Sequence, residues 1–173
     1  MRYLQQAGEL ALHRCANQEA IGHLTKGLVL LQSLPETPDR AQQGLFLHAA
    51  LGPAVMAVKG YASPDVERIY ERARELCRKV GETPQLFPVL WGLFAFYAVR
   101  ANFHTAREIA EQLLHLAQQL QDPALLVMSH EGLSQVMYLQ GELGRAREHA
   151  TQGVRLYDIS THRSLAFVYG EDP

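Results

Sequence analysis

Histidines next to carboxylates are the residues of this sequence whose types and spacing could do chemistry. Of the eight histidines, three follow a glutamate by four positions: Glu9 and His13, Glu19 and His23, and Glu111 and His115. Carboxylate-bridged di-metal bundles instead use Glu-x-x-His, in which the ligands stand three positions apart and point inward from facing helices. The spacing here favours exposed pairs on single helices, and we expect no metal site and no cofactor.

Motifs of catalytic sites are also missing from the sequence. The chain contains no H-E-x-x-H, no G-x-S-x-G and no glycine-rich phosphate loop, and nothing points to a Ser/His/Asp arrangement. Its two cysteines, Cys15 and Cys77, have neither CxxC nor metal-ligand spacing. Such isolated thiols are typical of reduced cysteines in a cytosolic protein. The sequence therefore predicts a cytoplasmic chain that is not an enzyme.

The composition is that of an ordinary globular protein. The 173 residues are 47% hydrophobic and 20% charged, with a formal net charge of −2. No apolar run reaches the roughly 18 residues that a membrane span needs, and the first residues lack the sections of a signal peptide. The densest basic stretch, VERIYERARELCRK, interleaves acidic residues, so that Glu71 can pair with Arg74 and Glu75 with Lys79. We therefore expect neither a membrane nor a nucleic acid as partner.

One helical segment occurs four times, at residues 19–39, 65–86, 105–125 and 145–165. Each copy carries a stripe at positions i, i+4 and i+7, the spacing of one helix face. The stripe begins at Ala20, Val66, Ala106 and Ala146, continues through Leu24, Tyr70, Ala110 and Ala150, and ends at Gly27, Ala73, Leu113 and Gly153. Its preference for small residues predicts helices that approach one another closely.

Another apolar helical segment precedes each copy, at about residues 2–15, 40–58, 86–100 and 124–140. Gly60 and Gly141 suit the positive φ that follows a helix, and Ser63 with Pro64 suits a helix start. The segment LFPVLWGLFAFYAV is apolar nearly all round, which indicates a helix between neighbours. No β-type alternation persists. The sequence therefore predicts an all-α fold of helix hairpins.

The fold expected from these repeats is an α-solenoid of about four antiparallel helix hairpins with a period near 40 residues. One hairpin cannot bury its own apolar stripe, whereas stacked hairpins share a continuous core. We expect a repeat domain over residues 1–158, with units of about 1–38, 39–84, 85–122 and 123–158. Residues 159–173 would then lead to a further repeat. Either the segment SLAFVY folds back over the end, or the exposed face pairs with another chain.

The residue pattern distinguishes between the known solenoid types. A 40-residue period is close to HEAT and armadillo repeats and longer than the 34 residues of tetratricopeptide (TPR) repeats. The fourth unit nevertheless has the TPR order of large, small and turn residues followed by the small-residue stripe: Leu133, Ser134, Gly141, Ala146, Ala150 and Gly153. The units therefore resemble TPR hairpins extended by about one turn.

Nearly the whole chain, and most specifically the stretch KGYASPDVERIYERARELC, resembles the TPR-rich region of large bacterial signalling proteins. Those proteins join a class III adenylate/guanylate cyclase, kinase or regulator domain to a STAND-type ATPase and then to such repeats. The cyclase aspartates and the GxxxxGK[ST] motif do not occur here. The resemblance therefore implies an interaction region without catalytic activity of its own.

In TPR proteins the first helices of the hairpins line a concave groove that binds peptides. The resemblance implies partner-binding positions at Gln5, Glu9, Met56, Trp91, Glu131, Gln135 and Tyr138. The Lys, Arg and Asn residues of a carboxylate clamp are missing from these positions, so we expect an apolar groove with acidic edges that takes an amphipathic helix. Trp91 and Tyr138 would be its anchors, unless they pack the core, as we expect for Phe94 and Tyr97.

The expected function is protein–protein interaction or regulation within a bacterial signalling protein. The partner would be a protein or peptide, including another domain of the same polypeptide, and the C-terminal face could form a homodimer. The alternative is a TPR domain that senses a ligand or peptide and controls an attached ATPase or cyclase. A discrete pocket around Trp91 and Tyr138 would favour the sensor, and an open apolar trough would favour the scaffold.

Overall fold

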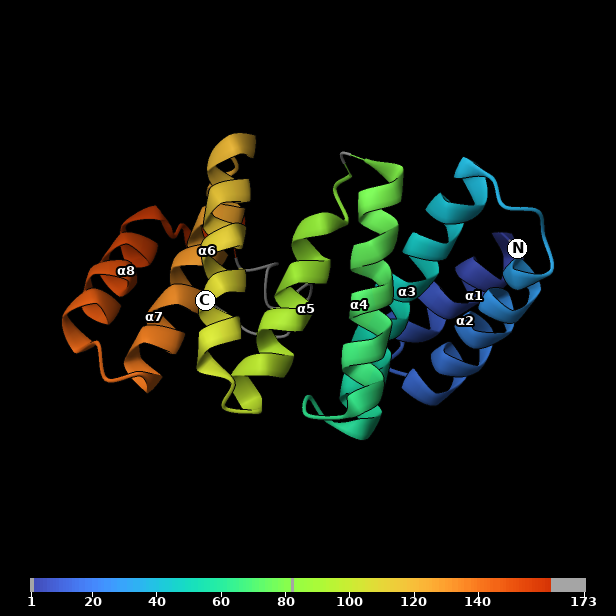
Figure 1. Ribbon diagram of the computed structural model, residues 1–173, viewed down its shortest axis with the longest axis horizontal. Coiled ribbons are helices and arrows are strands. Elements are labelled where there is room, and N and C mark those ends of the chain that lie inside the picture. Colours follow the sequence, from blue (N-terminus) through green and yellow to red (C-terminus); the bar gives the residue numbers. More distant parts are fainter. Residues whose placement is uncertain (1, 82, 163–173) are drawn as a thin grey trace. The chain divides into compact units, whose positions relative to one another are not determined.

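A computed structural model describes residues 2–81 and 83–162 of the chain, and over these ranges it contains helices and no strand (Figure 1). The helices are α1 (Arg2–His13), α2 (Asn17–Gln32), α3 (Pro38–Lys59), α4 (Pro64–Val80), α5 (Leu86–Val99), α6 (Phe103–Leu120), α7 (Pro123–Leu139), α8 (Leu143–Leu156) and α9 (Ile159–His162). They form two compact units, Met1–Phe96 and Tyr97–Pro173. Within each unit the helices pack mainly on their neighbours in the chain. The prediction of an all-helical chain is confirmed over the described residues.

Several helices begin at a polar side chain that accepts a hydrogen bond from the first turn of the backbone. Ser63 caps α4, because its hydroxyl accepts a hydrogen bond from the Asp65 backbone N–H at 3.3 Å. Asp122 caps α7 in the same way, because its carboxylate accepts a hydrogen bond from the Ala124 backbone N–H at 2.9 Å. Gly60 and Gly141 have φ angles of 83° and 82°, as the sequence predicts for residues that follow a helix.

The C-terminal end of the described chain departs from one continuous helix. α8 ends at Leu156 because Tyr157 adopts an extended conformation. The Asp158 carboxylate then accepts hydrogen bonds from the Ser160 backbone and side chain, and the four-residue helix α9 follows. The segment SLAFVY, for which two arrangements were expected, lies outside the described residues.

In the N-terminal unit, the small-residue stripe of α2 forms a tight helix contact. Ala20, Leu24, Gly27 and Leu31 are the buried residues of this helix. A Cβ at Gly27 would lie 3.3 Å from the Leu47 side chain of α3, and Ala54 of α3 clusters with Ala20 and Ala11. The stripe therefore lies under α3, as its preference for small residues predicts.

Tyr70 of α4 lies between two glycines of the flanking helices. A Cβ at Gly52 of α3 would come within 2.3 Å of the Tyr70 ring, and one at Gly92 of α5 within 2.2 Å. Real Cβ atoms do not approach other atoms so closely, so the ring occupies the space that the two glycines leave. Burial raises the pKa of the Tyr70 hydroxyl, which stays neutral.

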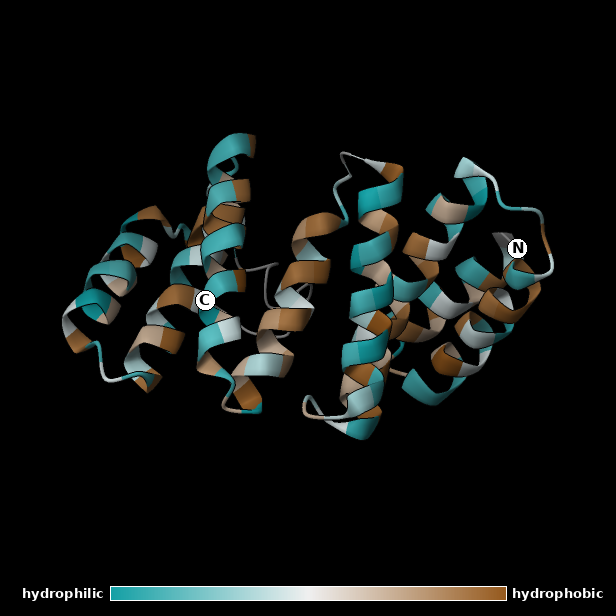
Figure 2. Ribbon diagram, in the orientation of Figure 1, coloured by the Kyte–Doolittle hydropathy of each residue, from teal (hydrophilic) through white to brown (hydrophobic). Residues whose placement is uncertain are grey.

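Helix α5 is apolar around most of its circumference, as Figure 2 shows in brown. Its buried residues are Phe87, Val89, Leu90, Trp91, Gly92, Leu93, Phe94 and Phe96. Residues on every face of the helix therefore contact protein rather than water. The neighbouring α4 has one apolar stripe and an exposed polar face instead.

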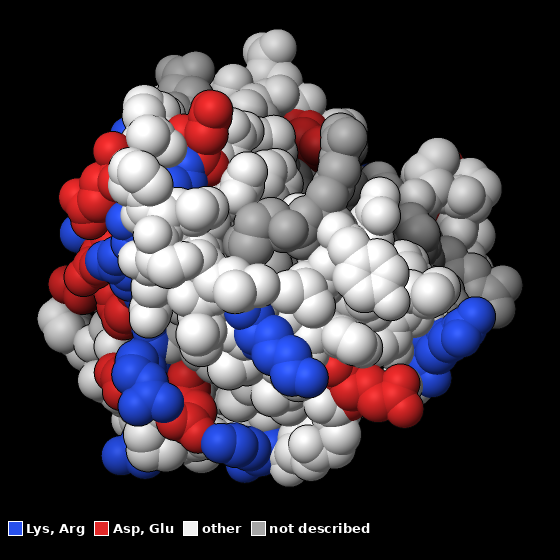
Figure 3. Space-filling view, turned by 90° about the vertical axis from the view of Figure 1, so that its right-hand side faces the viewer, with Lys and Arg blue, Asp and Glu red and all other residues white. Residues whose placement is uncertain are grey.

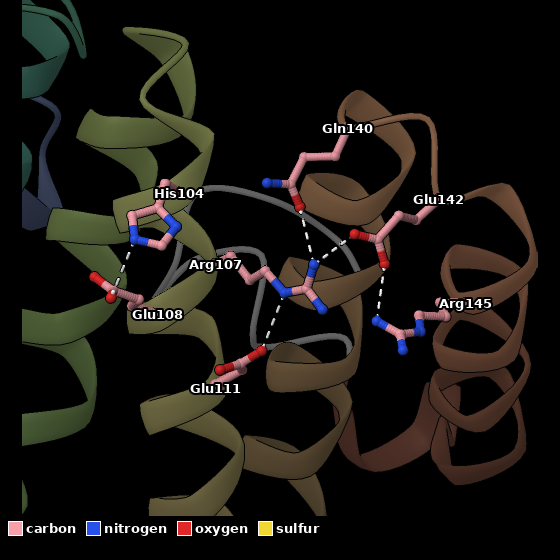
Figure 4. Close-up of polar contacts among 7 residues, drawn as sticks. All are labelled: His104, Arg107, Glu108, Glu111, Gln140, Glu142 and Arg145. Carbon is pink, nitrogen blue, oxygen red and sulfur yellow. Dashed lines mark hydrogen bonds and ion pairs between the residues drawn. The ribbon is translucent and has the colours of Figure 1, made fainter.

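In the C-terminal unit, an ion-pair network ties α6 to the turn between α7 and α8 (Figure 4). The Arg107 guanidinium donates to Glu111 at 3.1 Å on its own helix and to Glu142 at 2.6 Å. Glu142 also pairs with Arg145 at 3.0 Å. These contacts raise the pKa of Arg107 and lower the pKa of Glu142, in both cases mainly through their hydrogen bonds.

Charged side chains of both signs lie side by side along one edge of the face in Figure 3, and most of that face is uncharged.

None of the helices in the described part of the chain combines the length and the apolar character that crossing a membrane requires.

Replacing Gly52 with alanine should destabilise the protein, because the added methyl group must displace the Tyr70 ring. Overpacking of this kind costs about 1–3 kcal/mol, which exceeds the gain of up to about 1 kcal/mol in helix propensity. Urea denaturation measures the difference. The control is Gly22→Ala in α2, where an added Cβ meets no atom within 4 Å and should stabilise. Equal stabilisation by both changes would contradict the tight packing.

Replacing Arg107 with glutamine should lower the urea midpoint, because Glu142 loses its link to α6. The loss should shrink when the salt concentration rises from about 0.02 to 0.5 M, since salt screens partly exposed ion pairs. Arg145→Gln is the matched control, because this arginine pairs with the same carboxylate but is 63% exposed, against 22% for Arg107. A loss at Arg107 that salt leaves unchanged would refute an electrostatic role.

Candidate functional site

The strongest candidate site is a groove between α7 and α8, which we call the α7/α8 groove. It encloses about 670 Å³. Its lining residues are Val127, Glu131, Ser134, Gln135 and Tyr138 from α7, and Leu143, Ala146, Arg147, Ala150, Gly153, Val154 and Tyr157 from α8 and the residue after it. Both helices present one face to the groove, because these positions recur at three- and four-residue spacing.

Large apolar side chains of the groove are open to solvent. Tyr138 is 64% exposed, Leu143 61% and Val154 76%. Contiguous apolar surface on a folded chain marks interaction sites. Glu131, Gln135 and Arg147 add polar groups of both charge signs to the lining. The groove therefore exposes large apolar side chains beside polar groups of both charge signs.

The repeat alignment shows what this groove corresponds to in the N-terminal unit. Residues Ala146, Ala150 and Gly153 of α8 align with Ala20, Leu24 and Gly27 of α2. In α2 the middle position, Leu24, is fully buried, whereas Ala150 in α8 is exposed. The stripe that lies under α3 in one unit therefore lines an open groove in the other.

A second groove lies between α1 and α3, with a volume of about 700 Å³. Its lining is mostly polar: Gln5, Gln6, Glu9, Asp39, Gln42, Gln43, Phe46 and Leu47. The Gln5 amide donates to the Glu9 carboxylate at 3.0 Å, which fixes one wall. With glutamines and two carboxylates around Phe46 and Leu47, this surface suits a polar segment better than an apolar helix.

The residues predicted to bind a partner fall into three places. Gln5 and Glu9 lie in the α1/α3 groove, and Glu131, Gln135 and Tyr138 lie in the α7/α8 groove. Met56 and Trp91 are 9% and 7% exposed and belong to the core, where Trp91 packs on Phe94 with ring centroids 5.2 Å apart. Of the two expected anchors, only Tyr138 is therefore accessible.

Sequence reasoning missed the contribution of α8 to the groove. It assigned Ala146, Ala150 and Gly153 to a helix contact and left out Leu143, Val154 and Tyr157. The available signal was the apolar spacing itself, since Ala146, Ala150 and Val154 recur every four residues on one helix. What the sequence did not indicate is that no helix among the described residues covers this face.

Two histidines lie between α7 and α8 beside the groove. The Nδ1 atoms of His130 and His149 are 2.9 Å apart, so one neutral ring can donate to the other. Burial, and then the neighbouring His149, lower the pKa of His130. Burial also lowers the pKa of His149, although Glu148 opposes this effect. Both shifts favour the neutral form of the rings near neutral pH.

Acidification should destabilise the α7/α8 packing. Because the pKa of each folded histidine is lowered, the unfolded chain takes up protons first as the pH falls below about 6.5. The unfolding free energy should therefore be level above about pH 7 and decrease towards pH 5. Urea denaturation at several pH values checks this, and His149→Gln should flatten part of the decrease, since burial also lowers the pKa of His48 in α3. The control is His104→Gln, at a side chain that is 85% exposed; an equal flattening there would contradict the assignment.

Comparison with known proteins finds a distant relative. No protein-family model matches the sequence. The chain is similar to "Uncharacterized protein R02095" of Rhizobium meliloti (strain 1021), with 24% identity over 154 residues. The alignment covers 88% of this chain and 15% of that protein. The similarity therefore concerns one segment of a much longer protein.

Proposed function

We propose that this chain is a non-enzymatic protein-interaction module built from TPR-like antiparallel hairpins, and that its α7/α8 groove binds an amphipathic helix. The observation that carries this proposal is the exposed apolar lining of the groove, above all Tyr138 and Val154. Helices that lie in grooves are a common recognition mode, and accessible tyrosines are frequent anchors in interfaces.

The packing of α3 supports a particular kind of occupant. Leu47 of α3 lies over Gly27 of α2, and Gly44 lies against Leu31. The corresponding positions of α8 are Gly153 and Tyr157, which line the α7/α8 groove. The occupant is a helix that copies this face of α3, with a small residue against Tyr157 and a leucine one turn later over Gly153. It continues the helix-to-helix interface that the N-terminal unit already contains.

The source of this helix is another part of the same signalling polypeptide. The resemblance to TPR regions of bacterial cyclase–ATPase proteins supports this assignment. The length of the Rhizobium meliloti relative, of which this chain matches 15%, is compatible with it. The α7/α8 groove then serves as an internal docking site that regulates the neighbouring domain. A homodimer through the same face is the competing arrangement, and the light-scattering mass of the purified chain distinguishes the two.

Val154→Glu should abolish helix binding without unfolding the protein, because this side chain is 76% exposed and a carboxylate there opposes an apolar partner. The probe is a fluorescent 22-residue peptide with the sequence of α3, Pro38–Lys59, and fluorescence anisotropy measures its affinity. We expect at least about a tenfold loss, or 1.4 kcal/mol.

Val29→Glu is the matched control for this change. Val29 is an exposed valine of α2, at 60% exposure, and does not line the α7/α8 groove. Its replacement should leave the affinity within about twofold. If the peptide fails to bind the wild-type protein, or if both variants lose affinity equally, the groove is not the docking site for such a helix.

A further inference from the structure

A separate pocket lies where α2, α3 and α4 meet in the N-terminal unit. Its volume is about 370 Å³, at the lower end of the range for small-molecule sites. Leu28 and Leu31 of α2, Ala41 of α3 and Leu76 of α4 give it apolar walls. At Gly44 an added Cβ would lie 3.3 Å from Leu31 and 3.4 Å from Leu76. Because glycine has no side chain, these two leucines can approach α3 closely.

His48 contributes an enclosed polar atom to this pocket. Its Nδ1 atom is inaccessible to solvent and has no hydrogen-bond partner among the described residues. Buried polar atoms in folded proteins normally have a partner in the protein, in water or in a ligand. Burial, and then Arg72, lower the pKa of His48 to about 4. The ring is therefore neutral at neutral pH, and its Nδ1 atom can donate one hydrogen bond once a turn of the ring brings it to an acceptor in the pocket.

Cationic side chains surround the same space. Arg40 is held in place because its guanidinium donates to the Leu34 carbonyl at 2.7 Å. Arg72 pairs with Glu75 at 2.6 Å, so Glu75 does not take the Lys79 partner that its spacing suggested. Lys79 has no ion-pair partner in the described part of the chain. Glu36 is the one carboxylate among the described residues that line the pocket, so the three cationic side chains outnumber the acidic ones.

We infer that this pocket binds a small organic oxyanion, a carboxylate or a phosphate monoester, that carries a compact apolar group. The apolar group lies against the wall that Leu28, Leu31 and Leu76 form. The oxyanion lies between Lys79 and Arg72, and the His48 ring must turn for its Nδ1 atom to donate a hydrogen bond to it. A water molecule in the pocket would account neither for the excess of cations nor for the apolar walls.

This site is distinct from the α7/α8 groove, and it gives the ligand-sensing alternative a location. The expected sensor pocket was around Trp91 and Tyr138, yet Trp91 is buried and Tyr138 belongs to the other unit. All residues of the proposed site lie in the unit Met1–Phe96. Ligand binding here and helix binding in the groove can therefore be tested independently.

The test titrates the whole protein with three probes, 4-phenylbutyrate, phenyl phosphate and the uncharged 4-phenylbutyramide, and follows the His48 ring signals by NMR. We expect at least one of the two anions to shift these signals in a saturable manner. The amide should bind at least about tenfold more weakly, because it lacks the charge that strengthens each hydrogen bond. The two anions separate a carboxylate site from a phosphate site.

Two lysine variants complete the experiment. Lys79→Gln should weaken binding of the better anion about threefold to fivefold, the range of one exposed charge contact. Lys26→Gln is the control, since this exposed lysine of α2 does not line the pocket. The inference is overturned if no probe shifts His48, if the amide binds as well as the anions, or if both lysine variants weaken binding equally.

Discussion

The close approach of α3, α4 and α5 around Tyr70 is the constraint on which the N-terminal unit depends. The ring fills the space that side chains at Gly52 and Gly92 would need, so the three helices meet in one register. Interiors packed at this density respond to the addition of a single methyl group. The same register sets Gly44 between Leu31 and Leu76. These three residues line the pocket beside His48, so the shape of the pocket depends on this register.

The aligned faces of α2 and α8 differ in what covers them. Over α2, Leu47 and Ala54 of the next helix cover the stripe. Over α8, the same positions of the repeat line an open groove beside Tyr138 and Val154. A solenoid repeat contacts mainly its neighbours. A face that is structural within the array can therefore become a binding surface wherever the neighbouring helix comes from another segment, which is the basis of the proposed function.

Much of the fold could be predicted from the sequence, because helix periodicity and capping are local. The first-helix segments, the Ser63 cap and the glycines after α3 and α7 all follow from residue type and spacing. Three other helix ends have no such signal: Cys15, Ala101 and Gln121 adopt positive φ angles of 56°, 57° and 52° although none is a glycine. The candidate site was predicted only in part. Exposure depends on which helix covers a face, so Trp91 and Tyr138 look alike in sequence but differ in accessibility.

The two cysteines differ in accessibility, and this has a practical consequence for spectroscopy. Cys15 is exposed directly after α1, whereas Cys77 is buried in α4, where desolvation raises the pKa of its thiol. The cysteine thiolate is the nucleophile that attacks maleimide reagents, so these reagents should modify Cys15 in the native protein and spare Cys77. A fluorophore or spin label can therefore be attached at one defined position of the natural sequence, without first removing a cysteine by mutagenesis.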